Sequence, residues 1–296
     1  MIPQLRNAMT VDVEDFFQVQ AFAGCIDRAA WDEIVPRVED NVDRILAQFD
    51  AVGVTATFFT LGWIAERHKS MVRRIVAAGH ELASHGYEHI RADAQDPAAF
   101  RADVGRTRRL LEDIGGVRVR GYRAATFSIG ARNQWAFDAL EAEGYEYSSS
   151  VNPIRHDLYG MPEAPRLPYR PASGSLWEIP MTTVRAFGRN WPCSGGGFFR
   201  LLPYPVYRAG LAHVNRRERQ PGIFYFHPWE IDPGQPAVAN CSWKSRFRHY
   251  TNLSRMSDKL DRLLHDFAWG RMDRVFTEQL APRISARERA PVPLPA

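Results

Sequence analysis

The chain alternates short apolar runs with longer segments whose apolar positions repeat every three or four residues. The short runs are rich in β-branched and aromatic residues, which is typical of buried strands, and the longer ones are typical of amphipathic helices. Seven strands are predicted in this way, at residues 8–13, 54–61, 80–84, 117–122, 145–149, 176–181 and 222–227. Helices are predicted between them, at about 36–53, 65–78, 97–114, 133–143 and 253–268. This alternation favours a parallel α/β barrel of one domain, irregular because it has seven strands rather than eight.

Two stretches rich in proline and glycine, 151–175 and 185–205, are predicted to be long ordered loops. The second contains the run CSGGGFFR at 193–200. This run lacks the GxxxxGK[ST] pattern of a phosphate-binding loop, so we expect a flexible loop at the rim of the barrel. The barrel domain is expected to span residues 1–282, and residues 283–296 are expected to form a flexible tail.

Composition and charge argue against several classes of protein. The chain has no run of about 18 apolar residues, so no transmembrane segment is expected. The formal net charge is +4, but the arginines are spread along the chain, so nucleic-acid binding is not expected. Three cysteines without CxxC spacing argue against a disulfide framework. Residues 1–8 lack the apolar core of a secretory signal, and both observations favour a cytoplasmic protein.

Polar side chains occur where the predicted strands end. They are Asp12 and Glu14 after the first strand, His85 after the third, Arg123 after the fourth, Ser149 after the fifth and His227 after the seventh. Barrel enzymes place their active sites at the carboxyl ends of the strands. The positions therefore predict an active site at this rim.

Histidine and carboxylate side chains predict a divalent metal site. His85 and His89 are four residues apart, a spacing that lets both imidazoles reach one ion on a helical turn. Side chains alternate along a strand, so Asp12 and Glu14 project to one side. One of these carboxylates can bind the ion while the other accepts a proton. Asp15 is the rival ligand if the strand bulges or turns.

Arg123 and His227 are candidates for acid–base chemistry. A guanidinium at position 123 can keep a proton-accepting carboxylate such as Asp12 ionised. An imidazole that ends an apolar strand, as His227 does, is well placed as a general acid. The alternatives are an ordinary surface arginine and a histidine buried in the core, and His80 is expected to be structural.

Five ordered motifs carry a resemblance to a known family. They read TVDVEDFF at 10–17, SHGYEH at 84–89, GYRAATFSI at 121–129, YSSSVNPIRHDLYG at 147–160 and FYFHPWEIDPG at 224–234. The sequence resembles the polysaccharide deacetylases of carbohydrate esterase family four, in the branch linked to exosortase-associated exopolysaccharide gene clusters. The likeness continues through SRFRHYTNLSRM at 245–256 and so covers nearly the whole chain.

The resemblance implies a distorted (β/α)7 barrel that binds one divalent ion, Zn2+ or a similar metal. The implied site has a general base, an arginine paired with it, a general acid and metal ligands, which are respectively Asp12, Arg123, His227, and His85 and His89 together with Glu14 or Asp15. The expected substrate-binding residues flank these positions and are Tyr122, Phe127, Ser149 and Trp229. The aspartate that orients the acid histidine in the family has no clear counterpart here, and Asp157 is the candidate.

The predicted function is metal-dependent removal of N-acetyl groups from N-acetylhexosamine units of an exopolysaccharide or its precursor, with release of acetate. The expected partner is this acetylated amino-sugar polymer, with peripheral contact at the inner membrane if the precursor is lipid-linked. One alternative is a metal-independent, allantoinase-like hydrolase of a small cyclic amide, against which the His85/His89 pair weighs. The other is a carbohydrate-binding protein without turnover, which failure of Glu14 and Asp15 to reach the ion would favour.

Overall fold

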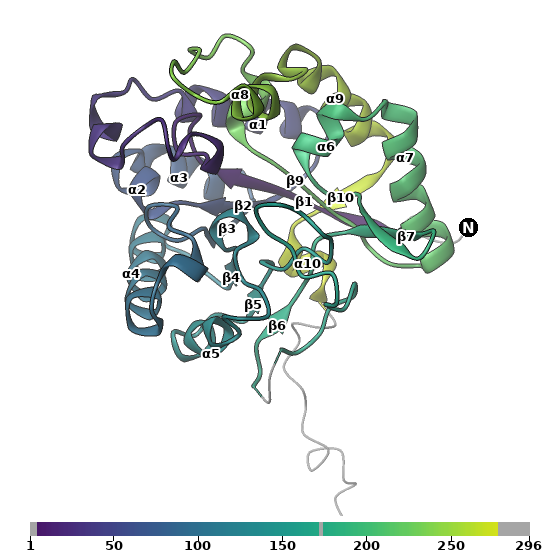
Figure 1. The fold of residues 1–296 in the computed structure, drawn as a ribbon, viewed down its shortest axis with the longest axis horizontal. Coiled ribbons are helices and arrows are strands. Elements are labelled where there is room, and N and C mark those ends of the chain that lie inside the picture. Colours follow the sequence, from purple (N-terminus) through teal and green to yellow (C-terminus); the bar gives the residue numbers. More distant parts are fainter. Residues whose placement is uncertain (1–4, 172–173, 278–296) are drawn as a thin grey trace, which may run out of the picture.

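A curled sheet of parallel strands lies at the centre of the computed structural model, which describes residues 5–171 and 174–277 (Figure 1). Its strands are β1 (Arg6–Val13), β2 (Thr57–Thr60), β3 (Glu81–Ser84), β4 (Gly121–Tyr122), β5 (Tyr147–Ser148), β6 (Trp177–Glu178), β9 (Ile223–Phe226) and β10 (Ala268–Gly270). All seven predicted strands are present, each somewhat shorter than predicted except β1. The short β10 was not predicted.

The order of the strands makes a barrel that is not fully closed. Strands β1 to β6 pair in sequence order, and β1 also pairs with β9 and β10. The pairing is parallel throughout, with Thr10 opposite Thr57 of β2 and Tyr225 of β9. Among the described residues no ladder joins β6 to β9, and on this side β9 has only an isolated bridge from Tyr225 to Gly195. The prediction of a distorted, parallel (β/α) barrel in one domain is therefore confirmed.

Most of the helices lie outside this sheet (Figure 1), and the last one contributes Met272 to the apolar cluster inside the barrel. The helices are α1 (Val38–Ala51), α2 (Gly62–Arg67), α3 (Lys69–Ala77), α4 (Pro97–Gly115), α5 (Trp135–Ala142), α6 (Gly196–Leu201), α7 (Tyr204–His213), α8 (Trp243–Tyr250), α9 (Met256–Asp266) and α10 (Met272–Val275). The local sequence explains the ends of α4 well. The Asp96 side chain caps its first turn by accepting the backbone N–H of Ala99, Pro97 occupies the first turn, and Gly116 ends it in the left-handed conformation.

Two predictions of local structure were wrong. The single helix expected at 65–78 is two helices, because the backbone leaves the helical conformation at His68, between α2 and α3. The stretch 185–205 is not a loop throughout, since it contains most of an antiparallel hairpin, β7 (Thr183–Ala186) with β8 (Arg189–Pro192), and all of α6. The tail expected at 283–296 lies outside the described residues.

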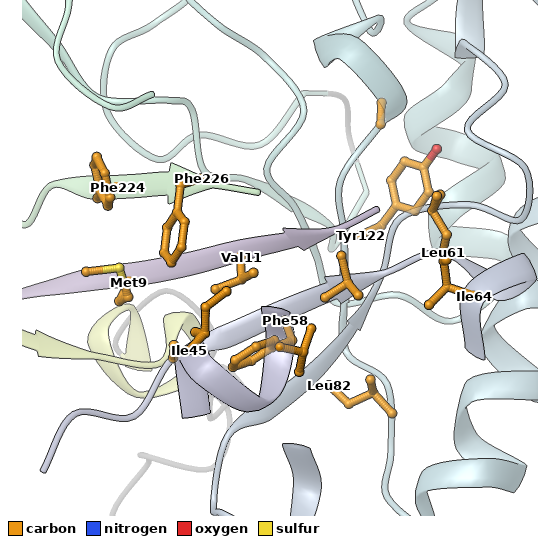
Figure 2. Packing of buried hydrophobic residues seen from close by; sticks show 14 of the residues in the cluster. Met9, Val11, Ile45, Phe58, Leu61, Ile64, Leu82, Tyr122, Phe224 and Phe226 are labelled. Atoms are coloured by element: carbon orange, nitrogen blue, oxygen red, sulfur yellow. The ribbon is translucent and has the colours of Figure 1, made fainter. Parts of the chain in front are cut away.

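The two faces of the strands bury different side chains. Met9 and Val11 of β1 point toward the helices and pack with residues such as Ile45 of α1 and Phe226 of β9 (Figure 2). The alternate positions point into the barrel, where a second apolar cluster contains Ala8, Phe59, Ala83, Tyr147, Ile179 and Tyr225. Because side chains alternate along a strand, Asp12 has the same orientation as Ala8 and lies at the top of this interior. The register of β1 therefore places a carboxylate inside the barrel.

One expectation about the cysteines was wrong. Cys25 and Cys241 form a disulfide, with their Cα atoms 5.7 Å apart and a separation of 216 positions in the sequence. Cys193 is free and buried. The bond joins the segment after the 3-10 helix η1 (Gln20–Phe22) to the loop before α8. The cytoplasmic prediction rested partly on reduced cysteines, so that part of its support is lost. No helix among the described residues is long and apolar enough to cross a membrane.

The disulfide predicts a simple thiol count. In denaturant, a thiol-specific reagent should titrate one cysteine per chain before reduction and all three afterwards. Reduction should lower the free energy of unfolding by about 2–4 kcal/mol, because the bond closes a long loop in the unfolded chain. In the matched variant Cys193→Ser the count should be none before reduction and two after it. Three reactive thiols in the unreduced wild-type protein would contradict the pairing.

Candidate active site

The carboxyl ends of four strands bring six polar side chains together. These are Asp12 in β1, Glu14 directly after β1, His85 and His89 after β3, Arg123 after β4, and His227 after β9. Five of the six are buried, and the exception is His227, whose side chain is 19% exposed. The site therefore opens to solvent at His227.

Arg123 holds Asp12 inside the barrel. Its Nη1 donates to Oδ1 of Asp12 at 2.5 Å and to the hydroxyl of Thr10 at 2.9 Å. Its other N–H groups donate to the carbonyl and the hydroxyl oxygens of Ser149, at 3.1 and 3.2 Å. The guanidinium also lies 4.0 Å from the ring centroid of Phe59. Both charges are buried, so removing either partner would leave an unpaired charge at a cost of about 3–5 kcal/mol.

Glu14 lies with the two histidines. One ligand atom from each of Glu14, His85 and His89 lies within 4.8 Å of the other two. Oε2 of Glu14 is 3.3 Å from Nε2 of His89, yet it accepts no hydrogen bond from the described residues. A buried carboxylate oxygen left in this state is costly, and a cation shared with the imidazoles would satisfy it. One carboxylate and two imidazoles also form a ligand set that catalytic Zn2+ sites use. The three residues therefore fit a divalent metal ion.

The histidines are in the neutral form that metal binding needs. Burial lowers the pKa of His85 to about 4 and that of His89 well below its usual value. Nδ1 of His85 donates to the carbonyl oxygen of Arg123 at 2.8 Å, which leaves Nε2 as the ligand atom. The spacing of His85 and His89 predicted both rings on one helical turn, and this prediction was wrong. They lie in an irregular turn after β3, in which Gly86 and His89 have φ of 76° and 53°, and their centroids are 5.2 Å apart.

His227 lies between two carboxylates. Its Nε2 is 3.0 Å from Oε1 of Glu14, and its Nδ1 is 3.1 Å from Oε2 of Glu230. Burial disfavours the imidazolium, but the two carboxylates outweigh this effect and raise the pKa of His227 to about 9. The imidazole therefore carries a proton at neutral pH, as a general acid must.

Two family models match successive parts of the chain. A family model described as polysaccharide deacetylase matches residues 29–148, and a second, described as a domain of unknown function (DUF3473), matches residues 149–277. The first half of the described barrel therefore matches a polysaccharide deacetylase domain. The two matched ranges meet at the end of β5, inside the barrel, so the second range supplies β6, β9 and His227 to the same fold as the first.

Curated relatives of the domain are named for peptidoglycan. The chain is 27% identical to a peptidoglycan deacetylase of Helicobacter pylori, over 73% of this chain and 70% of that protein. It is 30% identical to a peptidoglycan deacetylase-like protein of Gibberella zeae over 53% of this chain, and spans only about half (48%) of that protein. A crystal structure of a proposed polysaccharide deacetylase from Mycobacterium smegmatis has a TM-score of 0.57 and 19% identity, covering 96% of this chain and 95% of that one. This likeness shows the shared fold.

Asp15 of the deacetylase domain has a structural role. Its Oδ1 accepts the backbone N–H of Phe16, and its Oδ2 accepts those of Arg37 and Val38 at the start of α1. Both oxygens are thus occupied, Oδ1 by the next residue of the chain and Oδ2 by the start of α1, which it holds against the end of β1. The structure places Glu14, and not Asp15, beside the two histidines.

The four predicted substrate-binding residues are all buried. Tyr122 lies in the core against the rings of Phe100 and Tyr145, and Ser149 is fully buried as an acceptor for Arg123. Trp229 is buried between His227 and His249, in a stack with ring centroids 5.1 and 4.1 Å apart. The fourth residue, Phe127, is 5% exposed. These side chains shape the walls of the site, and none of them offers an open face to a sugar.

Asp157 was the predicted partner of His227, and it makes no hydrogen bond or ion pair with that histidine. Its carboxylate is exposed and pairs with Lys244 and Arg248 of α8 at 2.7 and 2.8 Å. The residue that contacts the acid histidine is Glu230, which was not predicted. The signal that could have revealed it is its spacing of three from His227 across Pro228, which is typical of a capped helix start.

Glu14 and Asp15 can be separated by their effects on metal binding and on stability. Glu14→Gln should weaken zinc binding by about 100-fold or more, because it removes an anionic ligand from between two imidazoles. Asp15→Asn should leave zinc affinity nearly unchanged but lower the free energy of unfolding by about 1–2 kcal/mol, since it weakens the cap of α1. Calorimetric titration with zinc and denaturant unfolding measure the two effects. The opposite pattern would make Asp15 the ligand.

Zinc binding should weaken as the pH falls below 7. Burial raises the pKa of Glu14 to about 7, so the metal-free carboxyl takes up a proton below that pH and must lose it when the cation binds. The histidines add little, because their lowered pKa values keep them neutral. The affinity should fall by up to about tenfold per pH unit between about pH 7 and 5. This dependence should largely vanish in Glu14→Gln, and an affinity that is flat in the wild-type protein would contradict the account.

Proposed function

We propose that this domain removes N-acetyl groups from N-acetylhexosamine units of a polysaccharide, with the help of a divalent cation, most consistent with Zn2+. The observation that carries the proposal is the meeting of three functions at one rim. A cation-binding trio, a buried carboxylate paired with arginine and a protonated histidine lie together at the carboxyl ends of the strands. The deacetylase family match supports the same chemistry.

The cation would be held by Glu14, His85 and His89, which are buried and close enough to share it. When bound, such a cation supplies a Lewis acid that activates water and polarises a carbonyl oxygen. The dry surroundings of the trio strengthen electrostatic interactions with any charge that develops there.

Asp12 and His227 then divide the proton transfers between them. As water attacks the acetamide carbonyl carbon, its proton passes to the carboxylate of Asp12, which Arg123 holds in place. As the C–N bond breaks, the Nε2 proton of His227 passes to the leaving nitrogen. The products are acetate and a free amine on the sugar. Two groups with opposite protonation in one site are what a hydrolysis of this kind requires.

The identity of the polysaccharide substrate is a separate part of the proposal. The motif resemblance favours an exopolysaccharide or its precursor from an exosortase-associated system, whereas the curated relatives are named for peptidoglycan. Both polymers present N-acetylhexosamine units, so the reaction is the same and the flanking surface decides between them. The cytoplasmic location and the contact with the inner membrane stay predictions.

The two alternative functions would require different groups at this site. A metal-independent, allantoinase-like hydrolase would have no need of Glu14 beside two neutral histidines. A carbohydrate-binding protein without turnover would have no need of a protonated histidine opposite a buried carboxylate. Chelator inhibition separates the first alternative from the proposal, and binding of acetylated oligosaccharide without acetate release would support the second.

Acetate release from N-acetylglucosamine oligomers, acetylated exopolysaccharide and peptidoglycan tests the proposal. Release should require zinc and stop with a chelator. Asp12→Asn and His227→Ala should each lower kcat by about 10²–10⁴-fold, because each removes one proton transfer, while zinc content stays unchanged. A variant that keeps near wild-type turnover would make its assigned role wrong. Absence of release from every substrate by the zinc-loaded wild type would overturn the proposal.

A further inference from the structure

Glu230 fixes the ring of His227 from the side opposite to the site. His227 is the residue before the short 3-10 helix η6 (Pro228–Ile231), and Glu230 lies in that helix. Oε2 of Glu230 accepts the backbone N–H of His227 at 3.0 Å and contacts its ring Nδ1 at 3.1 Å. Because the carboxylate contacts both the backbone N–H and the ring of His227, the imidazole has little freedom to rotate. It also leaves Nε2 as the nitrogen that faces the site.

Arg200 of α6 holds Glu230 in turn. Its Nε donates to Oε1 of Glu230 at 2.8 Å, and the two side chains are 2% and 1% exposed. The remaining N–H groups of Arg200 donate to the carbonyl oxygens of Arg248, His249 and Thr251, at the end of α8. The guanidinium is therefore fixed by several partners. Arg200 and His227 outweigh the effect of burial and hold the pKa of Glu230 at about 2, so the carboxylate is charged.

The glycine-rich run at 194–197 makes room for this carboxylate. A Cβ atom on Gly196 would lie 2.1 Å from Oε2 of Glu230, the oxygen that contacts His227. A Cβ atom on the next residue, Gly197, would meet nothing within 4 Å. The run is therefore not a flexible rim loop, as its composition suggested, but the start of α6 packed against Glu230.

We propose that Glu230, held by Arg200 and accommodated by Gly196, is the positioning residue for the acid His227. The inference rests on the proposed function. Glu230 keeps the Nδ1 proton of His227 engaged and stabilises the imidazolium, so that the Nε2 proton is aimed at the departing nitrogen. When that proton moves to the nitrogen and the C–N bond breaks, Glu230 orients the neutral ring that remains. Glu230 lies in the short helix η6 that His227 caps, so the positioning residue and the acid belong to one local segment.

Three variants test this with a matched glycine pair. Glu230→Gln and Gly196→Ala should each lower kcat for acetamide hydrolysis by about 100-fold or more, with KM and zinc content unchanged. Gly197→Ala should behave as the wild type, because its Cβ atom has open space. An aryl acetate has a leaving group that needs no proton, so its hydrolysis should fall by less than about fivefold in all three. A merely structural role would lower both reactions together.

A spectroscopic measurement on the zinc-loaded protein gives a readout that does not depend on turnover. The Nδ1 proton of His227, identified by its absence in His227→Gln, should be observed in the wild type and Gly197→Ala. It should be lost to exchange in Glu230→Gln and Gly196→Ala. Acetamide turnover near wild type in either of these two variants, or equal losses on amide and aryl ester, would overturn the positioning role alone. If the wild-type protein releases no acetate from any acetylated sugar, the proposed function fails first, and the acid role fails with it.

Discussion

The buried charge of Arg123 is the constraint on which the rim of this barrel depends. A guanidinium without water must satisfy its N–H groups within the protein, and here it does so with Asp12, Thr10 and Ser149. These partners come from β1 and from the segment after β5, on different sides of the barrel interior. The backbone carbonyl of Arg123 also accepts Nδ1 of His85. One residue thus fixes the position of the proposed base and the orientation of a proposed metal ligand.

From the Arg123–Asp12 pair outward, carboxylates and nitrogen-bearing side chains alternate across the site. Glu14 lies between His89 and His227, and Glu230 lies between His227 and Arg200. Each buried carboxylate has a nitrogen partner, and each occupies a different environment. Asp12 faces a permanent cation, whereas Glu14 faces imidazoles and has a pKa raised to about 7 by burial. Side chains of one chemical type can in this way take separate roles as base, metal ligand and positioning group.

Sequence reasoning found the strands because a buried strand is a local pattern of apolar residues. It missed what depends on contacts made by the folded chain. Which of the adjacent residues Glu14 and Asp15 faces the histidines is decided by contacts with α1, because Oδ2 of Asp15 accepts the backbone N–H groups of Arg37 and Val38 at the start of that helix. The helix α7 begins after Pro203 and contains Pro205, and because of these prolines its start was predicted to be part of a loop.

Long-range pairs left no signal in the sequence. Cys25 and Cys241 are 216 residues apart, and Arg200 reaches Glu230 from another helix. The catalytic candidates Asp12, His85 and His227 were found because each ends a strand, and the parallel topology then brings such positions to one rim. The sequence could identify these residues, but not the groups that hold them.

The most direct test is a crystal structure of the zinc-loaded protein with anomalous diffraction measured at the zinc edge. The account predicts one strong peak bonded to the Glu14 carboxylate and to one nitrogen each of His85 and His89, at about 2.0–2.2 Å. A peak bonded to Asp15, or a zinc ion bound elsewhere while these three side chains stay unliganded, would contradict it.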